Sequence, residues 1–91
     1  MQVQVKLYPP FSLFAGVREC EVEVDDGASV GAALRQLCQR FPALTALLGP
    51  LDDDQLFRRQ AIVLLGDDIT DLSCKVTPGC RLSLVGPLQG G

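Results

Sequence analysis

Two stretches of strict alternation between apolar and polar residues, at residues 2–7 and 19–24, constrain the fold more than any other feature of this chain. A period of two places every second side chain on the same face of an extended backbone, which is the pattern of a half-buried strand. Pro9-Pro10 ends the first stretch, and a short acidic turn ends the second. The inward residues are Val3, Val5 and Leu7 in the first and Cys20, Val22 and Val24 in the second. We therefore expect an opening antiparallel hairpin with one apolar face, its strands joined by a loop over residues 11–16.

One amphipathic helix is expected after this hairpin, over residues 29–41. Ser29 is a suitable N-cap, because its hydroxyl can accept a hydrogen bond from the backbone N–H groups that open a helix. Pro42 disfavours helical geometry in the residue before it, so the helix should end near Phe41. The apolar stripe at helical spacing consists of Val30, Ala33, Leu34, Leu37, Cys38 and Phe41. We predict that this stripe is core and that residues 43–48 add a short helical turn.

The second half of the chain contains two further strand signals. Residues 61–65 form a β-rich apolar run, which ends in a Gly-Asp-Asp turn before a short returning segment at Ile69. Residues 81–85 alternate again, with the two leucines on one side. The order of strands around the helix predicts an α+β fold. We expect a mixed sheet of four to five strands, covered on one face by the main helix, with the first and last strands adjacent.

Composition excludes several classes of function. The 91 residues are enough for one domain, residues 1–91, that folds without disulfides or a structural metal. The net charge is −3 and the basic residues are scattered, so nucleic acid is not an expected partner. The apolar runs are too short to cross a membrane, and the first residues lack the pattern of a signal peptide. We therefore expect a cytoplasmic protein with no membrane partner.

The cysteines and the acidic run do not form a recognisable site. Cys20, Cys38, Cys74 and Cys80 contain no CxxC pair, and the chain has no histidine, so we expect reduced thiols and no zinc. The first two fall on predicted core faces, whereas the last two flank a turn. A catalytic thiol would need a neighbouring group that lowers its pKa. The three aspartates at residues 52–54 lack the spacing of a calcium loop, and we expect a solvated loop there.

The end of the sequence carries the feature that points to function. The last predicted strand leads into an extended tail, residues 85–91, which ends in Gly90-Gly91. Because glycines have no Cβ, such a tail can enter a narrow channel and leave the terminal carbonyl open to attack. The alternative is a disordered end without a role, which is common for chain termini. A small domain whose final strand leads directly into the tail that ends in these glycines favours a reactive carboxylate on Gly91.

Several segments of the sequence resemble those of the ubiquitin-like β-grasp sulfur carriers, above all the MoaD and ThiS families. The resemblance covers essentially the whole chain, including the opening strand, the helix after Ser29 and the hairpin after Ala61. It rests further on Phe14-Ala15-Gly16-Val17-Arg18-Glu19 and on Val85-Gly86-Pro87-Leu88-Gln89-Gly90-Gly91. The first of these phrases is closer to MoaD, the small subunit of molybdopterin synthase, than to ThiS. The family usually has a proline where this chain has Gly86.

The resemblance implies a sulfur carrier in molybdenum cofactor biosynthesis. A ubiquitin-activating-type adenylyltransferase, similar to MoeB or ThiF, would use ATP to adenylate Gly91. A sulfur donor such as a cysteine desulfurase or rhodanese would then convert the adenylate into a thiocarboxylate. A large subunit similar to MoaE would receive the tail and supply the catalytic residues, so the chain would have no permanently bound cofactor and no independent active site. The tail residues that would bind the partner are Gly86, Pro87, Leu88, Gln89 and Gly90.

Other functions stay open at this point. The sulfur could serve thiamine, cysteine, tungsten-pterin or tRNA thiolation pathways. The chain could be a ubiquitin-like modifier joined through Gly91 to lysines of other proteins, or an interaction domain whose tail is never activated. An exposed apolar patch on the sheet face away from the helix is the expected docking surface, but the pattern alone does not assign its residues.

Overall fold

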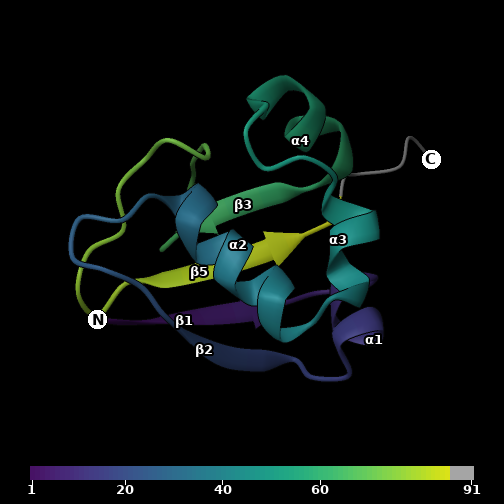
Figure 1. Ribbon diagram of the computed structural model, residues 1–91, viewed down its shortest axis with the longest axis horizontal. Coiled ribbons are helices and arrows are strands. Elements are labelled where there is room, and N and C mark those ends of the chain that lie inside the picture. The colour runs from purple at the N-terminus through teal and green to yellow at the C-terminus, as the bar shows by residue number, and fades with distance from the viewer. Residues whose placement is uncertain (87–91) are drawn as a thin grey trace.

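The computed structural model describes residues 1–86, and Figure 1 shows a single sheet with one helix lying across it. The strands are β1 (Gln2–Leu7), β2 (Glu19–Glu23), β3 (Ile62–Leu65), β4 (Asp68–Ile69) and β5 (Arg81–Val85). The helices are α1 (Phe11–Ala15), α2 (Val30–Arg40), α3 (Ala43–Leu48) and α4 (Asp54–Gln60). The predicted α+β fold, a mixed sheet with its main helix on one face, is confirmed.

The sheet has the strand order β2-β1-β5-β3-β4, which places the first and last strands side by side. β1 and β2 pair antiparallel, with Val5 opposite Cys20, as the opening alternation predicted. β1 and β5 pair parallel, with Leu7 opposite Leu84, and β5 also pairs antiparallel with β3. β5 therefore lies at the centre of the sheet and is paired along both of its edges.

Helix α2 supplies the core that the alternating strands require. Its predicted N-cap is confirmed, because Ser29 Oγ accepts a hydrogen bond from the backbone N–H of Ala32 at 3.1 Å. Its predicted end is confirmed as well, since Phe41 is the C-cap and donates its backbone N–H to the carbonyl oxygen of Leu37. The side chains without any exposed surface are Val3, Val30, Ala33, Leu34, Leu37, Leu44, Leu48, Leu82 and Leu84. The inner sheet face, α2 and α3 thus share one core.

The segment between the first two strands, expected to be a loop, contains helix α1. The helix begins at Phe11, whose side chain is buried, and ends before Gly16. Gly16 has the left-handed φ of 79° that favours glycine, and it donates its backbone N–H to the carbonyl oxygen of Ser12 at 2.9 Å. The loop prediction was wrong because a five-residue helix is too short to form by propensity alone and depends on the burial of Phe11.

The acidic run is not a plain solvated loop either. Asp53 is the N-cap of α4, and its Oδ1 accepts hydrogen bonds from the backbone N–H groups of Gln55 at 3.0 Å and Leu56 at 3.2 Å. Asp54 is the first residue of the helix, and its Oδ1 accepts a hydrogen bond from the backbone N–H of Leu72 at 2.9 Å. The loop prediction was wrong here because α4 is two turns long and buries only Phe57, so its sequence shows no apolar stripe.

Candidate functional site

The predicted tail leaves the fold at the end of β5, beside the segment that follows β1. Tyr8 donates its backbone N–H to the carbonyl oxygen of Leu84 at 3.0 Å. A Cβ atom at Gly86 would lie 3.1 Å from Cδ of Pro10 and 3.3 Å from the carbonyl oxygen of Pro9. Because both distances are shorter than ordinary contacts, a side chain at this position would push the tail and the proline segment apart. Glycine at the exit is therefore explained by close packing.

The remaining predicted site residues, Pro87, Leu88, Gln89, Gly90 and Gly91, lie outside the described residues, and their roles stay predictions. The structure places the point from which they continue. The carboxyl ends of β1 and β5 face the same end of the sheet, where α1 also lies (Figure 1). The tail thus starts from a backbone position that two neighbouring strands define.

The sheet face opposite α2, here called the open face, carries apolar side chains at one corner. Residues that pair across neighbouring strands point to the same face, and Ile62 lies opposite Val85 while Leu64 lies opposite Ile69. Ile69 is 74% exposed and Tyr8 is 38% exposed, whereas the other three are half-buried. We call these five residues, Tyr8, Ile62, Leu64, Ile69 and Val85, the apolar band. Since Val85 directly precedes Gly86, the band adjoins the tail exit.

Sequence reasoning expected such a patch but did not assign these residues. Residues 62–65 are all apolar, so the sequence does not show which of these side chains α2 covers. The pairing of β3 with β5 decides this, because Val63 lies opposite the fully buried Leu84. One sequence signal was available. The Gly-Asp-Asp turn after residue 65 predicts that the chain returns beside β3, which places Ile69 next to that strand.

The four cysteines are free and half-buried. Burial raises the pKa of the Cys20 thiol, and the nearby Arg40 guanidinium opposes this shift only partly. Burial also raises the pKa of the Cys38 thiol, against a smaller opposing effect of a hydrogen bond with Thr45. Because the thiolate is the reactive form, these two side chains are poor nucleophiles at neutral pH. Cys74 and Cys80, which flank a turn in the sequence, pack against the core as well.

Within residues 1–86, no group of three or more His, Cys, Asp or Glu side chains is placed to hold a metal ion. No helix in that part of the chain has both the length and the apolar character needed to span a membrane.

The mixed sheet, the covering helix and the central last strand define a ubiquitin-like β-grasp protein. The sequence profile of the ThiS family matches residues 11–91, and the chain belongs to this family. The predicted relationship to the MoaD and ThiS sulfur carriers is thereby confirmed. No curated protein sequence gives a significant match to the chain.

Several solved structures are similar to the chain over nearly its full length, among them one from each of three organisms. SAMP1 from Haloferax volcanii is 30% identical with a TM-score of 0.84, and the alignment covers 100% of each chain. A chain in the Amycolatopsis orientalis BexX/CysO complex is 20% identical with a TM-score of 0.78, over 98% of this chain and 99% of that one. A chain in the complex of subunits 1 and 2 of the molybdopterin-converting factor from Helicobacter pylori is 23% identical with a TM-score of 0.63, over 100% of both. At these identities the last two show a common fold.

Proposed function

We propose that this chain is a sulfur carrier that acts as the small subunit of molybdopterin synthase in molybdenum cofactor biosynthesis. The observation that carries the proposal is the ThiS family match, which runs from residue 11 to residue 91 and so includes the predicted reactive glycine. The likeness to a chain in the complex of subunits 1 and 2 of the Helicobacter pylori molybdopterin-converting factor supports this pathway. A large subunit similar to MoaE supplies the pocket and the acid and base groups.

The chemistry takes place at the carboxylate of Gly91. An unactivated carboxylate is a poor electrophile, so an adenylyltransferase similar to MoeB or ThiF joins it to AMP, and pyrophosphate leaves ATP. The terminal sulfur of a persulfide on a cysteine desulfurase or rhodanese then displaces AMP, so that a C–S bond replaces the C–O bond to the phosphate. A second thiol attacks the S–S bond of this acyl disulfide, which breaks with formation of a new disulfide and leaves the sulfur on Gly91. The resulting thiocarboxylate gives its sulfur to the acceptor that the large subunit holds. Gly91 is the carrier group in this scheme, and the partners perform the catalysis.

The described part of the chain supports docking through the open face. A partner seated on the apolar band lies next to Gly86 and is in position to receive the residues that follow it. Gly86 packs closely against the proline segment, since an added Cβ would lie 3.1 Å from Cδ of Pro10, and this packing restricts where the start of the tail can lie relative to the band. Such a restriction lowers the entropy that is lost when the partner binds the tail.

The decisive test is the intact mass of the protein after incubation with the adenylyltransferase of the same host, ATP and a sulfur donor. Replacing the terminal OH by SH should add about 16 Da, because sulfur is heavier than oxygen by that amount. The matched control is the variant lacking Gly91, which should keep its fold and gain no mass. Unchanged mass in the full chain, with an enzyme that is active on another carrier, would contradict the proposal. Conversion of a pyranopterin precursor by the large subunit would then establish the pathway.

A second candidate function is covalent modification of other proteins. The observation that favours it is the 30% identity to SAMP1 from Haloferax volcanii, a small archaeal modifier protein. The same adenylate at Gly91 would then react with a lysine amine, which forms an isopeptide bond and releases AMP. Denaturing gels of host extracts, probed for this chain, would show a ladder of larger adducts that the variant lacking Gly91 does not form.

A further inference from the structure

The open face carries charged side chains as well as the apolar band, and they are sorted by strand. The outward residues of edge strand β2 are the acidic band, Glu19, Glu21 and Glu23, and all three are exposed. Two cations follow on the next strands, Lys6 on β1 and Arg81 at the start of β5, and we call them the basic band. The apolar band begins at Tyr8, directly after β1, and extends across β5, β3 and β4. Across the sheet the order is therefore acidic, basic, apolar.

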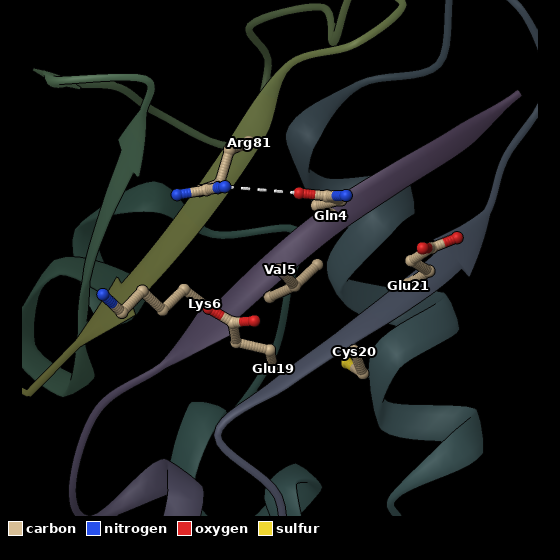
Figure 2. Close-up of a pocket in the computed structure, with 7 residues that line it drawn as sticks. All are labelled: Gln4, Val5, Lys6, Glu19, Cys20, Glu21 and Arg81. Atoms are coloured by element: carbon tan, nitrogen blue, oxygen red, sulfur yellow. Dashed lines mark hydrogen bonds between the residues drawn. The ribbon is translucent and has the colours of Figure 1, made fainter.

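A hollow of about 200 Å³ separates the first two bands. Figure 2 shows Glu19 and Glu21 on its β2 side, and Lys6 and Arg81 on its β5 side, with Gln4 between them. Arg81 donates a hydrogen bond from Nη2 to Oε1 of Gln4 at 3.5 Å. The Lys6 side chain extends away from Glu19, as Figure 2 shows, and its Nζ lies 5.2 Å from the centroid of the Tyr8 ring.

The two bands do not neutralise each other within the described chain. Among residues 1–86 the one ion pair joins the N-terminal amine of Met1 to Oε1 of Glu23 at 3.2 Å. Glu19 and Glu21 therefore keep their charges available for another molecule, although Lys6 lies opposite Glu19 in the strand register. Neighbouring strands are about 4.8 Å apart, whereas a group that hydrogen bonds to one of these side chains approaches it to about 3 Å. Because the Coulomb energy falls with distance, a partner group in direct contact senses mainly the sign of the charge that it contacts.

We propose that these bands set the orientation in which a protein partner docks on the open face. The partner fits when it places arginine side chains against Glu19 and Glu21, carboxylates against Lys6 and Arg81, and apolar side chains against the apolar band. Arginine suits the acidic band because a guanidinium can bind a carboxylate through two parallel hydrogen bonds, and alternate residues of a strand present two carboxylates about 7 Å apart. This inference rests on the proposed function, since it describes how the activating adenylyltransferase meets the carrier.

Orientation matters here because the tail leaves from one corner of the face. A partner could cover the apolar band and yet be rotated by 180° about the normal to the sheet. Its tail-binding channel would then lie away from Gly86. Apolar contacts have little directional preference, whereas like charges brought together oppose a wrong docking. The bands therefore add the directional information that the apolar corner lacks.

The test is a variant in which the two charged bands are exchanged, Glu19→Lys, Glu21→Lys, Lys6→Glu and Arg81→Glu. Two changes to lysine and two to glutamate cancel, so the net charge stays at −3. A matched control exchanges two exposed charges near the ends of α4, Asp52→Lys and Arg59→Glu, at the same net charge. Binding to the adenylyltransferase of the same host would be measured by biolayer interferometry at low and high salt, with thermal unfolding as the test of folding.

We expect the exchanged variant to bind at least about tenfold more weakly at low salt, mainly through slower association, and the difference to shrink at high salt. The α4 control should bind as the wild type does. If the exchanged variant does not fold, Glu19→Gln with Glu21→Gln serves instead and should flatten the salt dependence of the association rate. Equal affinity and equal salt dependence of folded variant and wild type would overturn the inference and leave the carrier function standing. A wild-type protein that neither binds the enzyme nor gains mass would overturn both.

Discussion

The two faces of the sheet use the same strands for different purposes. On the inner face, Leu82 and Leu84 have no exposed surface and pack beneath α2. On the open face, the neighbouring positions hold Arg81 and Val85, and the exposed side chains are sorted into bands of charge and apolar surface. Because successive side chains of a strand point to opposite faces, one stretch of five residues carries both patterns. If the open face is the docking surface, stability and recognition depend on alternate positions of this strand, and each should be open to change without the other.

The difference between the two faces is tested most directly by truncating a leucine to alanine on each of them. Leu84→Ala should lower the free energy of unfolding by about 2–5 kcal/mol, because it leaves a cavity in the core. Leu64→Ala removes the same atoms from a half-buried position on the open face and should cost less than about 1.5 kcal/mol. Urea unfolding followed by circular dichroism measures both. Similar costs for the two variants would mean that the open face is part of the stabilising core.

The reverse experiment changes docking and spares stability. Ile69→Glu places a charge in the apolar band at a side chain that is 74% exposed. The free energy of unfolding should change by less than about 0.5 kcal/mol, whereas affinity for the activating enzyme should fall about tenfold or more. Leu13→Glu on α1 is the matched control, since Leu13 is 75% exposed and lies outside the band. If both variants bind equally well, the apolar band is not the docking surface.

Asp53 and Asp52 offer a comparison within the acidic run. Asp53→Ala should lower the free energy of unfolding by about 1 kcal/mol, because two backbone N–H groups of α4 lose their acceptor. The Asp52 side chain accepts no hydrogen bond within residues 1–86, so Asp52→Ala should have almost no effect. Urea unfolding of the pair measures the difference. Equal stability of the two variants would mean that the hydrogen bonds of Asp53 do not stabilise α4, as expected for a solvated loop.

Gly86 lies where the two faces meet the tail. Gly86→Ala should cost about 1 kcal/mol or less in unfolding free energy, because the added methyl group displaces only the segment at Pro9 and Pro10. The initial rate of thiocarboxylate formation, followed by intact mass, should fall more than this small cost suggests, since the start of the tail moves relative to the apolar band. A variant that is modified at the wild-type rate would show that the exit position does not matter.

The smallest expected effect concerns the half-buried thiols of Cys20 on β2 and Cys38 on α2. Burial raises the pKa of the Cys20 and Cys38 thiols, so each holds less thiolate than an open thiol at the same pH. Alkylation by iodoacetamide at pH 8 should therefore be at least about threefold slower at these two cysteines in the folded protein than in urea. Peptide mapping by mass spectrometry gives the rate at each position. Rates that do not change on unfolding would contradict the burial of both side chains.

The regular elements were predictable from the sequence because their patterns follow from backbone geometry. The alternation of residues 2–7 indicated the inner side chains, and the stripe after Ser29 indicated the covering helix with both of its ends. The short helices were not predictable in this way. α1 and α4 exist because Phe11 and Phe57 are buried against the rest of the fold, and a local pattern does not contain that contact.

An apolar patch on the open face was predictable as a kind of surface but not as a set of residues. Tyr8, Ile62 and Val85 are far apart in the sequence and come together only through the pairing of β5 with both β1 and β3. A shift of one residue in that register would turn each of these side chains toward the core. The charges of the open face were visible as single residues, while their order across the sheet also depends on strand order. Long-range pairing is thus the information that the sequence pattern lacked.

The central place of β5 has a mechanical consequence. β5 is hydrogen bonded to β1 on one edge and to β3 on the other, and it runs parallel to β1. Tension applied to the chain beyond Gly86 and resisted at the start of β1 loads these bonds in shear, so that they must rupture together instead of opening one after another. The pairing of β5 with β1 therefore makes the domain resistant to unfolding by a force that pulls on the chain beyond Gly86.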